Sequence, residues 1–212
     1  RSTTVTGVQT CALPIFQKRV GYGKALVRHR KYDNLCLLPT SQVADKSAIE
    51  PEQMQELVQV MRNEFDYILI DCPAGIEQGF QTAISGADLG IVVTMPEIAA
   101  VRDADKIIGR LQSEEKDIRL VVNRIRPQMV KEGTMLDMSQ IDEILSVPCI
   151  GQVPDDMKVV DSANRGIPVV EWEDSVAGQA YRDIVARVCG EDVPFRPLET
   201  RSEEHTSELQ SR

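Results

Sequence analysis

Residues 65–77 read FDYILIDCPAGIE, and this stretch decides the fold. The short apolar run at 67–70 predicts a buried strand, because a strand that is apolar on both faces is typical of a parallel sheet covered by helices. A single acid, Asp71, follows the run. In such sheets ligands bind beyond the carboxyl ends of the strands, so we expect Asp71 to lie on the functional edge.

Asp71 admits two interpretations at this point. An apolar run followed by Asp is the Walker B pattern, whose carboxylate helps to hold Mg²⁺ in P-loop NTPases. Many α/β proteins, however, end a strand in Asp only to cap the loop or helix that follows. Pro73 and Gly75 then predict a tight loop, because proline has a fixed φ and no N–H, whereas glycine tolerates positive φ.

The rest of the chain alternates between expected strands and expected helices. Apolar runs bounded by turn residues predict strands at 34–38, 67–70, 89–94, 118–122, 149–153 and 169–170. Apolar residues at helical spacing predict helices at 51–65, 77–85, 97–114, 139–145, 155–164 and 176–188. This alternation predicts an α/β fold with a doubly wound, mostly parallel sheet flanked by helices. The length of 212 residues favours one domain.

Three local signals mark helix ends. Pro51 suits the first position of a helix, where its missing N–H costs nothing. Ser139 followed by Asp142 suggests a capped helix start. Gly190 is expected to end the last helix in a left-handed conformation.

Composition limits the class of protein. The net charge is −9 and the sequence pI about 4.8, which argues against broad nucleic-acid binding through a basic face. The five cysteines are odd in number and form no CxxC pair, so a reduced cytoplasmic chain is favoured over a disulfide framework. We find no apolar run of transmembrane length and no signal peptide.

Both ends of the chain differ from its body. Residues 1–15, RSTTVTGVQTCALPI, show no helical or strand periodicity, and SEEHTSELQSR at 202–212 is equally unpatterned. Both strings resemble translated sequencing-adapter DNA, so we exclude them from fold reasoning. We expect a non-native segment at 1–15, a partial ATPase domain at 16–195, and a disordered, non-native tail at 196–212.

Several segments together carry a family resemblance: DCPAGIEQG at 71–79, SGADLGIVVTMPEIAAVRDADKIIG at 85–109, LVVNRIRP at 120–127 and SANRGIPV at 162–169. They resemble the MinD family of septum-site-determining ATPases, in the deviant-Walker group that also contains ParA and nitrogenase iron protein. The resemblance runs from about Gln17 to Phe195. It is specific because AGIE after the strand-end acid occurs together with VRDAD at a helix start.

The resemblance implies a nucleotide site that takes ATP and Mg²⁺. Asp71 is then the Walker B acid, which contacts Mg²⁺ through water or orients the attacking water. Gly75 lets the backbone approach the γ-phosphate, unless it is a plain turn glycine. Asn123 matches the adenine-reading position, where a carboxamide can donate and accept, unless it is only a strand-end turn residue. Pro154 and Asp155 resemble the loop that closes over adenine through its backbone.

The resemblance also implies partners. Arg102 and Asp103 begin a helix near the dimer and partner face, although an exposed intrahelical charge pair would explain them equally well. The family forms a homodimer when ATP is bound. It binds a MinC-like division inhibitor and a MinE-like or equivalent positional regulator, and we expect no specific nucleic acid. Its location is the cytoplasm and the inner face of the bacterial cytoplasmic membrane, which it reaches through a C-terminal helix.

The chain departs from the family pattern at both ends. Members open with a strand and a KGGxGKT phosphate loop, and residues 21–25 (GYGKA) do not replace it. They lack the required glycine spacing, and Ala25 stands where a Mg²⁺-binding Ser or Thr is needed. We expect these residues to form a surface loop or a helix. Residues 191–200 lack the apolar face of a membrane-docking helix.

The expected function is therefore that of an ATP-dependent dimerising switch in the intact parent protein, which positions the division septum by recruiting a division inhibitor to the membrane. The 212-residue chain itself is expected to be inactive, because it lacks the phosphate-loop lysine. A ParA-type ATPase that positions DNA, plasmids or flagella is the alternative, as is a catalytically inert interaction module.

Overall fold

The computed structural model describes residues 4–6, 22–39, 50–73, 75 and 78–198. The chain divides into two compact units, which we describe separately. The first runs to Gly90 and includes Ser113–Asp117, and the second comprises Ile91–Gln112 and the residues from Ile118 onward. Length alone favoured one domain, but each unit gathers a hydrophobic core of its own.

The first unit contains a four-stranded sheet in the order β2-β3-β1-β4. β3 (Leu35–Leu37) and β4 (Tyr67–Leu69) both pair in parallel with β1 (Thr4–Thr6), which lies between them. β2 (Val27–Arg28) pairs antiparallel with β3. We expected no strand within residues 1–15, and β1 corrects this expectation. Its TVT sequence consists of β-branched residues, which favour strands.

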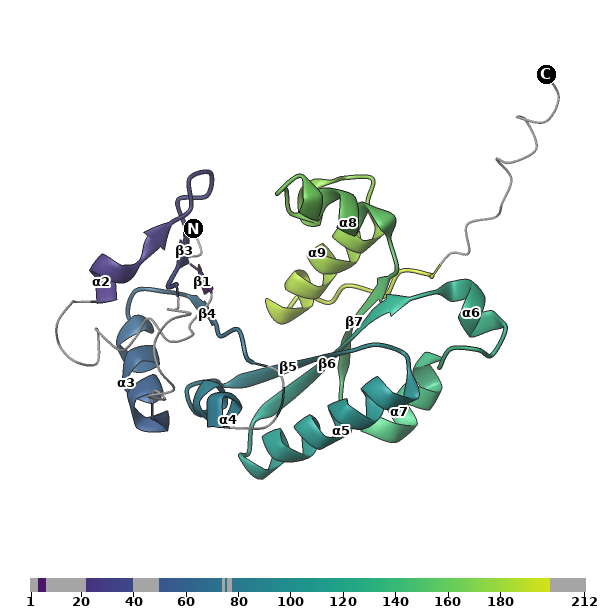
Figure 1. Ribbon diagram of the computed structural model, residues 1–212, viewed down its shortest axis with the longest axis horizontal. Coiled ribbons are helices and arrows are strands. Elements are labelled where there is room, and N and C mark those ends of the chain that lie inside the picture. Colours follow the sequence, from purple (N-terminus) through teal and green to yellow (C-terminus); the bar gives the residue numbers. More distant parts are fainter. Residues whose placement is uncertain (1–3, 7–21, 40–49, 74, 76–77, 199–212) are drawn as a thin grey trace, which may run out of the picture. The chain divides into compact units, whose positions relative to one another are not determined.

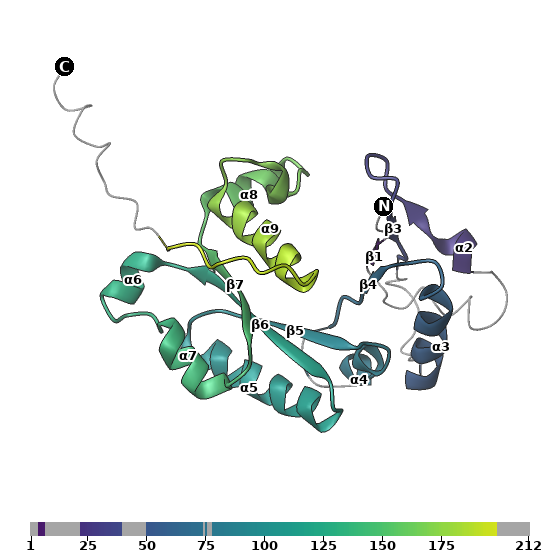
Figure 2. The ribbon, with the colours of Figure 1, turned by 180° about the vertical axis from the view of Figure 1, so that it is seen from behind.

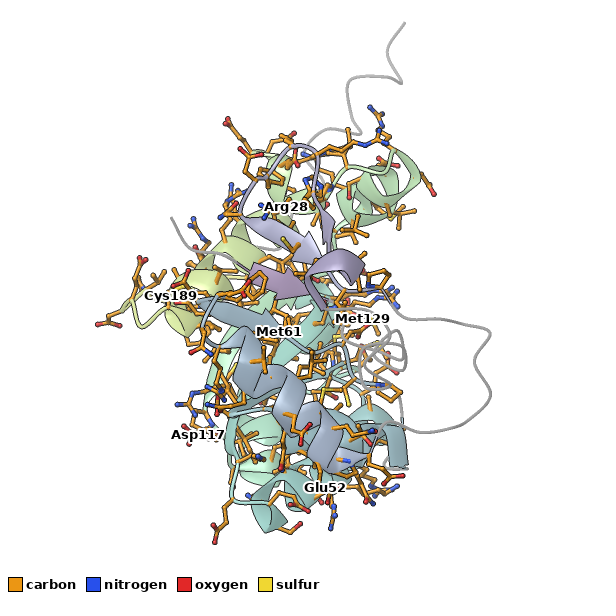
Figure 3. The ribbon with its side chains drawn as sticks, turned by 90° about the vertical axis from the view of Figure 1, so that its left-hand side faces the viewer. Arg28, Glu52, Met61, Asp117, Met129 and Cys189 are labelled. Atoms are coloured by element: carbon orange, nitrogen blue, oxygen red, sulfur yellow. The ribbon has the colours of Figure 1, made fainter. Side chains whose placement is uncertain are left out.

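The core of the first unit lies between α3 (Pro51–Met61) and the strands β3 and β4. Its buried side chains are Cys36, Leu38, Met54, Leu57, Val58, Met61 and Phe65. Figure 3 shows Glu52 and Met61 near the two ends of α3. α4 (Gln78–Ser85) packs against α3, and short α2 (Tyr22–Ala25) forms the helix expected around the GYGKA segment.

β4 is less buried than the sequence predicts. Ile68 and Ile70 pack against the core, but Tyr67 is 38% exposed and Leu69 is 49% exposed. β4 is the end strand of its sheet, and alternate side chains of a strand point to opposite faces, only one of which carries this core. The expectation of burial on both faces was therefore wrong for this strand.

The second unit is built on a three-stranded sheet in the order β5-β6-β7. The strands are β5 (Leu89–Thr94), β6 (Asp117–Ile125) and β7 (Cys149–Pro154). β6 pairs in parallel with β7, and the pairing register shifts between Val122 and Ile125. This irregularity falls at the carboxyl end of β6, where the sequence places Asn123.

Helices cover both faces of this sheet, as a doubly wound arrangement requires. α5 (Ile98–Ser113) and α7 (Met138–Leu145) lie on one face, while α8 (Met157–Asn164) and α9 (Val176–Val188) lie on the other (Figures 1 and 2). The residues packed between β6, β7 and α9 are Val121, Ile150, Val153, Ala177, Ala180 and Ile184. Gly190 follows α9 with a φ of +89°, so the predicted glycine end of this helix is confirmed.

Two expectations near α7 need correction. The cap of α7 is Asp137, whose carboxylate accepts a hydrogen bond from the backbone N–H of Gln140, and not Ser139. Asp and Ser both cap well, and the helix begins at Met138, one residue earlier than expected. A short helix, α6 (Pro127–Lys131), lies between β6 and α7, where the sequence analysis expected no helix; Pro127 suits its first position.

A third correction concerns residues 169–170, where we expected a strand. They belong to a 3₁₀ helix, η1 (Val169–Glu171). Pro168 precedes it and accepts a hydrogen bond from the backbone N–H of Glu171, which closes a turn. Two β-branched residues are too few to form a strand against this local bonding.

The segment 191–198 is held against α9. Arg196 donates to both carboxylate oxygens of Asp183, at 2.5 and 3.0 Å. Arg187 donates to the carbonyl oxygens of Val193 and Pro194. Residues 196–198 were expected to belong to a disordered tail, but this ion pair orders Arg196; residues 199–212 lie outside the described chain. None of the described helices is both long and apolar enough to span a membrane.

Candidate functional site

Asp71 and Gly75 lie just beyond β4 in the first unit. Asp71 is exposed and follows the strand end by two residues, because β4 ends at Leu69 and not at the expected residue 70. Partial burial of the Cys72 thiol, followed by the adjacent Asp71 carboxylate, raises the pKa of Cys72. Gly75 has a φ of +95°, and a Cβ added there would meet none of the described residues within 4 Å. A side chain would be strained there, so both a turn and a close backbone approach to a ligand fit this glycine.

The carboxylate of Asp71 suits Mg²⁺ as a hard oxygen ligand. Among the described residues, no group of three or more His, Cys, Asp or Glu side chains gathers in a way that could hold a metal ion. Mg²⁺ is usually bound through one or two carboxylates, water and substrate phosphates rather than by a cage of protein ligands. An exposed acid such as Asp71 therefore fits a metal that arrives together with a nucleotide.

Asn123 lies near the carboxyl end of β6 in the second unit. Its carboxamide oxygen Oδ1 accepts a hydrogen bond from the backbone N–H of Arg124 at 2.8 Å. Arg124 has a φ of +58°, which is uncommon for a residue with a side chain. Together with the register shift against β7, this conformation forms a β-bulge. Asn123 is thus half-buried within a bulged strand that continues to Ile125, beyond the strand end expected at residue 122.

Pro154 and Asp155 lie beside this bulge, at the end of β7. Pro154 pairs with Ile125, and the backbone N–H of Asp155 donates to the carbonyl oxygen of Ile125 at 2.8 Å. The Asp155 carboxylate accepts a hydrogen bond from Nε of Arg126 at 2.6 Å and lies 3.6 Å from Nε of Arg124. The structure therefore brings the predicted residues Asn123, Pro154 and Asp155 together at one edge.

Arg124 and Arg126 are site residues that the sequence reasoning missed. They flank Asp155 on both carboxylate oxygens and anchor the loop after β7 to the end of β6. A signal existed in the sequence, because two arginines alternate with an apolar residue directly after Asn123 and an acid follows the next strand. This signal shows that opposite charges follow two neighbouring strands, but it does not show which of them meet, because that depends on the register between β6 and β7.

The loop after β7 is fixed on its other side by Asp156, which caps α8. Its carboxylate accepts hydrogen bonds from the backbone N–H of Lys158, from the hydroxyl of Ser175 and from the backbone N–H of Ala177. Burial acts to raise the pKa of Asp156, but these hydrogen bonds outweigh it and lower the pKa. Asp156 thus ties the starts of α8 and α9 together and holds its neighbour Asp155 in place.

The arginines also border a cavity of about 480 Å³. It is lined by apolar side chains that include Ile98, Met129 and Leu136. The backbone N–H of Arg126 donates to Sδ of Met135 at 3.3 Å, and Nη1 of Arg126 lies 4.0 Å from Sδ of Met129. Arg126 is consequently held from both sides, by Asp155 and by the methionines.

Arg102 and Asp103 are exposed on the first turns of α5. Asp103 forms an ion pair with Lys106 at 2.9 Å along the same helix. This agrees with the plain interpretation of Asp103 as an intrahelical charge, although its partner is Lys106. The role of Arg102 and Asp103 at a partner face stays a prediction.

The donor set at the carboxyl ends of β6 and β7 fits an adenine base. A carboxamide both donates and accepts, and the oxygen of Asn123 keeps a second lone pair beyond the bond to Arg124. The half-buried bulge and the fixed loop at Asp155 offer a rigid edge for a flat ring.

Comparison with known proteins identifies the relatives of this arrangement. Residues 34–189 match the family model of ParA, described as NUBPL iron-transfer P-loop NTPase. The septum site-determining protein MinD of Bacillus subtilis (strain 168) is 45% identical over 200 residues, which cover 93% of this chain and 75% of that protein.

Solved structures agree. The MinC:MinD cell division protein complex of Aquifex aeolicus matches with a TM-score of 0.84 at 36% identity, over 93% of this chain and 86% of that chain. MinD complexed with Mg-ADP from Pyrococcus horikoshii OT3 matches with a TM-score of 0.74 at 21% identity, over 89% of this chain and 83% of that one, which shows a shared fold. The chain thus has the α/β P-loop NTPase fold, and it belongs to the MinD family of septum site-determining proteins within the ParA group.

Proposed function

We propose that the intact parent protein is an ATP-dependent dimerising switch that positions the division septum by recruiting a division inhibitor to the membrane. By parent we mean a protein that carries residues 16–195 together with a phosphate loop. The observation that carries the proposal is Asp71, an exposed acid two residues beyond the end of a parallel strand, which resembles the Walker B position of the family. The MinD relationship supplies the biological setting.

Each candidate residue has a distinct part in this proposal. Bound Mg²⁺ would supply positive charge at the γ-phosphate, where the charge of the transition state spreads. The Asp71 carboxylate holds that metal through water or orients the attacking water. Gly75, at a positive φ, lets the backbone lie close to the γ-phosphate. Asn123 reads the adenine edge, and Pro154 and Asp155 close over the ring through their backbone.

The proposed partners follow from the relatives. A relative forms a MinC:MinD complex, so a MinC-like inhibitor is the expected partner, with Arg102 and Asp103 on the face that receives it. We further propose an ATP-bound homodimer, a MinE-like or equivalent positional regulator, and attachment to the inner face of the bacterial cytoplasmic membrane. The chemistry of switching is then the gain and loss of γ-phosphate contacts.

The test is nucleotide binding and hydrolysis by the intact parent. We expect tight Mg²⁺-dependent ATP binding, dimerisation with ATP but not with ADP, and slow hydrolysis. Capture of a purified MinC homologue by the ATP-bound form would support the septum function. Retention of DNA instead would favour the ParA-type alternative, and failure to bind any nucleotide would favour the inert interaction module.

The 212-residue chain is proposed to be catalytically inactive. The GYGKA segment lacks the glycine spacing of a phosphate loop, and its described residues Tyr22–Ala25 form a short helix, α2. Purified chain should therefore show no Mg²⁺-dependent phosphate release above a no-protein blank. Measurable turnover that survives further purification would overturn this proposal.

A further inference from the structure

A basic turn joins β2 to β3 in the first unit, and the proposed nucleotide site does not use it. Residues 28–31 read RHRK, which places three cations within four positions of a protein whose net charge is −9. All residues from 27 to 34 are exposed, and neither Arg28 nor Arg30 forms an ion pair with another described residue. Asp33 is the one acid between positions 27 and 37, so the turn keeps a net positive charge.

Hydrogen bonds and ring contacts give this turn a defined shape. Nδ1 of His29 accepts hydrogen bonds from the backbone N–H groups of Lys31 and Tyr32, both at 3.1 Å. The rings of His29 and Tyr32 stack with their centroids 5.0 Å apart, and Nζ of Lys31 lies 5.1 Å from the centroid of the Tyr32 ring. The backbone N–H of His29 donates to the carbonyl oxygen of Leu35 at 2.9 Å. Because the turn is already folded, little ordering is needed when its cations meet a partner.

The turn lies at the edge of its sheet opposite to Asp71. It precedes β3, which runs parallel to β1, as β4 does, so the turn is at the amino ends of these strands and Asp71 follows a carboxyl end. Figure 1 shows the turn at the end of the first unit away from α3. Asp66 precedes β4 at the same edge, but β1 separates β4 from β3, so this acid is two strand spacings, about 10 Å, away.

An anionic lipid surface fits this turn better than a nucleic acid does. A membrane touches only the projecting part of a protein, and its negative surface potential attracts each Lys or Arg that comes near it. A nucleic acid is instead held along a groove or stripe of basic residues, which the acidic composition does not favour. Tyr32 is 37% exposed beside the cations, and tyrosine is enriched at membrane–water interfaces.

We propose that the turn at 28–32 is an electrostatic contact site for anionic phospholipid headgroups, separate from the C-terminal helix of the family. Arg28, Arg30 and Lys31 bind lipid phosphates, and Tyr32 lies at the level of the headgroups. The inference rests on the proposed attachment to a membrane, and it adds residues of this chain that touch the lipid. Because the turn and Asp71 lie at opposite edges of the sheet, lipid and nucleotide can be bound at the same time.

The test measures how the purified 212-residue chain partitions onto sedimented vesicles, without nucleotide. Vesicles of phosphatidylcholine alone are compared with vesicles of phosphatidylcholine and phosphatidylglycerol in equal parts, at low and at high salt. The triple variant Arg28→Gln, Arg30→Gln and Lys31→Gln removes the three cations of the turn. Thermal unfolding and size-exclusion chromatography show whether each variant is folded and monodisperse.

The matched control is the triple variant Lys106→Gln, Lys131→Gln and Arg165→Gln. It removes the same charge from exposed side chains on α5, on α6 and after α8. A second variant, Arg30→Glu, reverses one charge on a side chain that forms no hydrogen bond or ion pair with the described residues. This single change keeps the test decisive if the triple variant of the turn does not fold.

We expect the wild-type chain to bind the phosphatidylglycerol vesicles and not those of phosphatidylcholine alone. Binding should be lost at about 1 M salt, where the Debye length is about 3 Å. The partition coefficient should fall at least about tenfold in the triple variant of the turn, because each cation near the surface adds to the attraction. It should also fall in Arg30→Glu and stay near the wild-type value in the control.

An equal loss in both triple variants would overturn the inference, because net charge and not the turn would then control binding. Unchanged vesicle binding in Arg30→Glu and in the triple variant of the turn would also overturn it, as would tighter retention of duplex DNA than of vesicles by the wild-type chain. A wild-type chain that binds neither kind of vesicle would overturn the inference and leave the ATP-dependent switch standing, because no nucleotide enters this assay.

Discussion

Two regions carry the candidate nucleotide-site residues: the loop after β4, and the carboxyl ends of β6 and β7. The two regions are built differently. After β4, Asp71, Cys72 and Pro73 are all exposed, and a Cβ added at Gly75 would meet none of the described residues within 4 Å. At the other edge, Asp155 is fixed by two arginines and a backbone hydrogen bond, and Asp156 ties two helices together.

This difference indicates that the two edges have different roles. We call the edge at the ends of β6 and β7 the braced edge, because Arg124, Arg126 and a backbone hydrogen bond hold Asp155 there. Such an edge suits recognition of a ligand of fixed shape, because its groups keep their positions before the ligand arrives. An exposed acid beside a glycine suits a group that changes during the reaction, such as a phosphate with its metal and water. The following predictions test whether the two edges differ in this way.

The largest effect is expected at Asp71. In the intact parent, Asp71→Asn should lower kcat for ATP about 10²-fold, since the metal or attacking water loses its negative anchor. The melting temperature should not change, because the exposed side chain contributes little to the core. A paired measurement of kcat and melting temperature checks both statements.

The matched control for this prediction is Asp155→Asn at the braced edge. It should lower the melting temperature slightly, because it weakens a partly exposed ion pair worth up to about 1 kcal/mol. If Asp71→Asn instead lowers the melting temperature and leaves kcat near normal, Asp71 is a loop cap and the contrast between the edges fails.

The sequence predicts where the candidate residues lie along the strands better than it predicts the contacts that hold them. Apolar runs followed by polar residues locate Asp71, Asn123 and Asp155 without any structure, because strand periodicity is a local property. The bulge at Arg124 could not be derived in this way, since a left-handed residue within a strand depends on the pairing register with β7. The Arg126–Asp155 ion pair likewise depends on that register.

Segment ends show the same limit. The sequence alone assigned residues 169–170 to a strand because valine favours strands, but the turn closed by Pro168 determines their conformation. The burial of β4 was overestimated for a similar reason. An apolar run shows that a strand has apolar faces, but the helices that pack on the sheet decide which face is covered.

The packing that supports the braced edge is tested by Gly178→Ala. Gly178 lies in the first turn of α9, where an added Cβ would overlap the carbonyl oxygen of Val169. Because a backbone atom cannot move aside easily, we expect a loss of about 1–3 kcal/mol in the free energy of unfolding. Chemical denaturation of the purified protein measures this loss.

Gly109→Ala provides the control for that change. Gly109 lies within α5, and an added Cβ meets nothing within 4 Å. Alanine favours a helix over glycine, so this variant should gain up to about 1 kcal/mol. If both alanine variants change stability in the same direction, steric overlap at Val169 is not the reason.

A smaller, pH-dependent effect is expected at Asp183. Hydrogen bonds from Arg196, together with the charges of Arg187 and Arg182, lower the pKa of Asp183 although burial opposes them. A lowered folded-state pKa stabilises the protein above the unfolded value of about 4, and this contribution is lost as the pH falls through the folded pKa. The melting temperature of Asp183→Asn should therefore lie a few degrees below wild type at pH 7, and the gap should close below about pH 4. A gap that persists at low pH would contradict the role of this charge.

The smallest effect is expected for the ion pair between Asp103 and Lys106 on α5. Both side chains are largely exposed, at 76% and 67%, although their charged atoms lie 2.9 Å apart. Water screens such a pair and ordering two mobile side chains opposes it, so a double-mutant cycle with Asp103→Asn and Lys106→Gln should give a coupling energy below about 0.5 kcal/mol. ATP hydrolysis by the parent should stay at the wild-type level in both variants. A coupling above about 1 kcal/mol would show that this surface is braced like the edge at Asp155. With a weak coupling and unchanged hydrolysis, any loss of inhibitor binding in Asp103→Asn would come from the partner face itself, because neither the fold nor the nucleotide site would have changed.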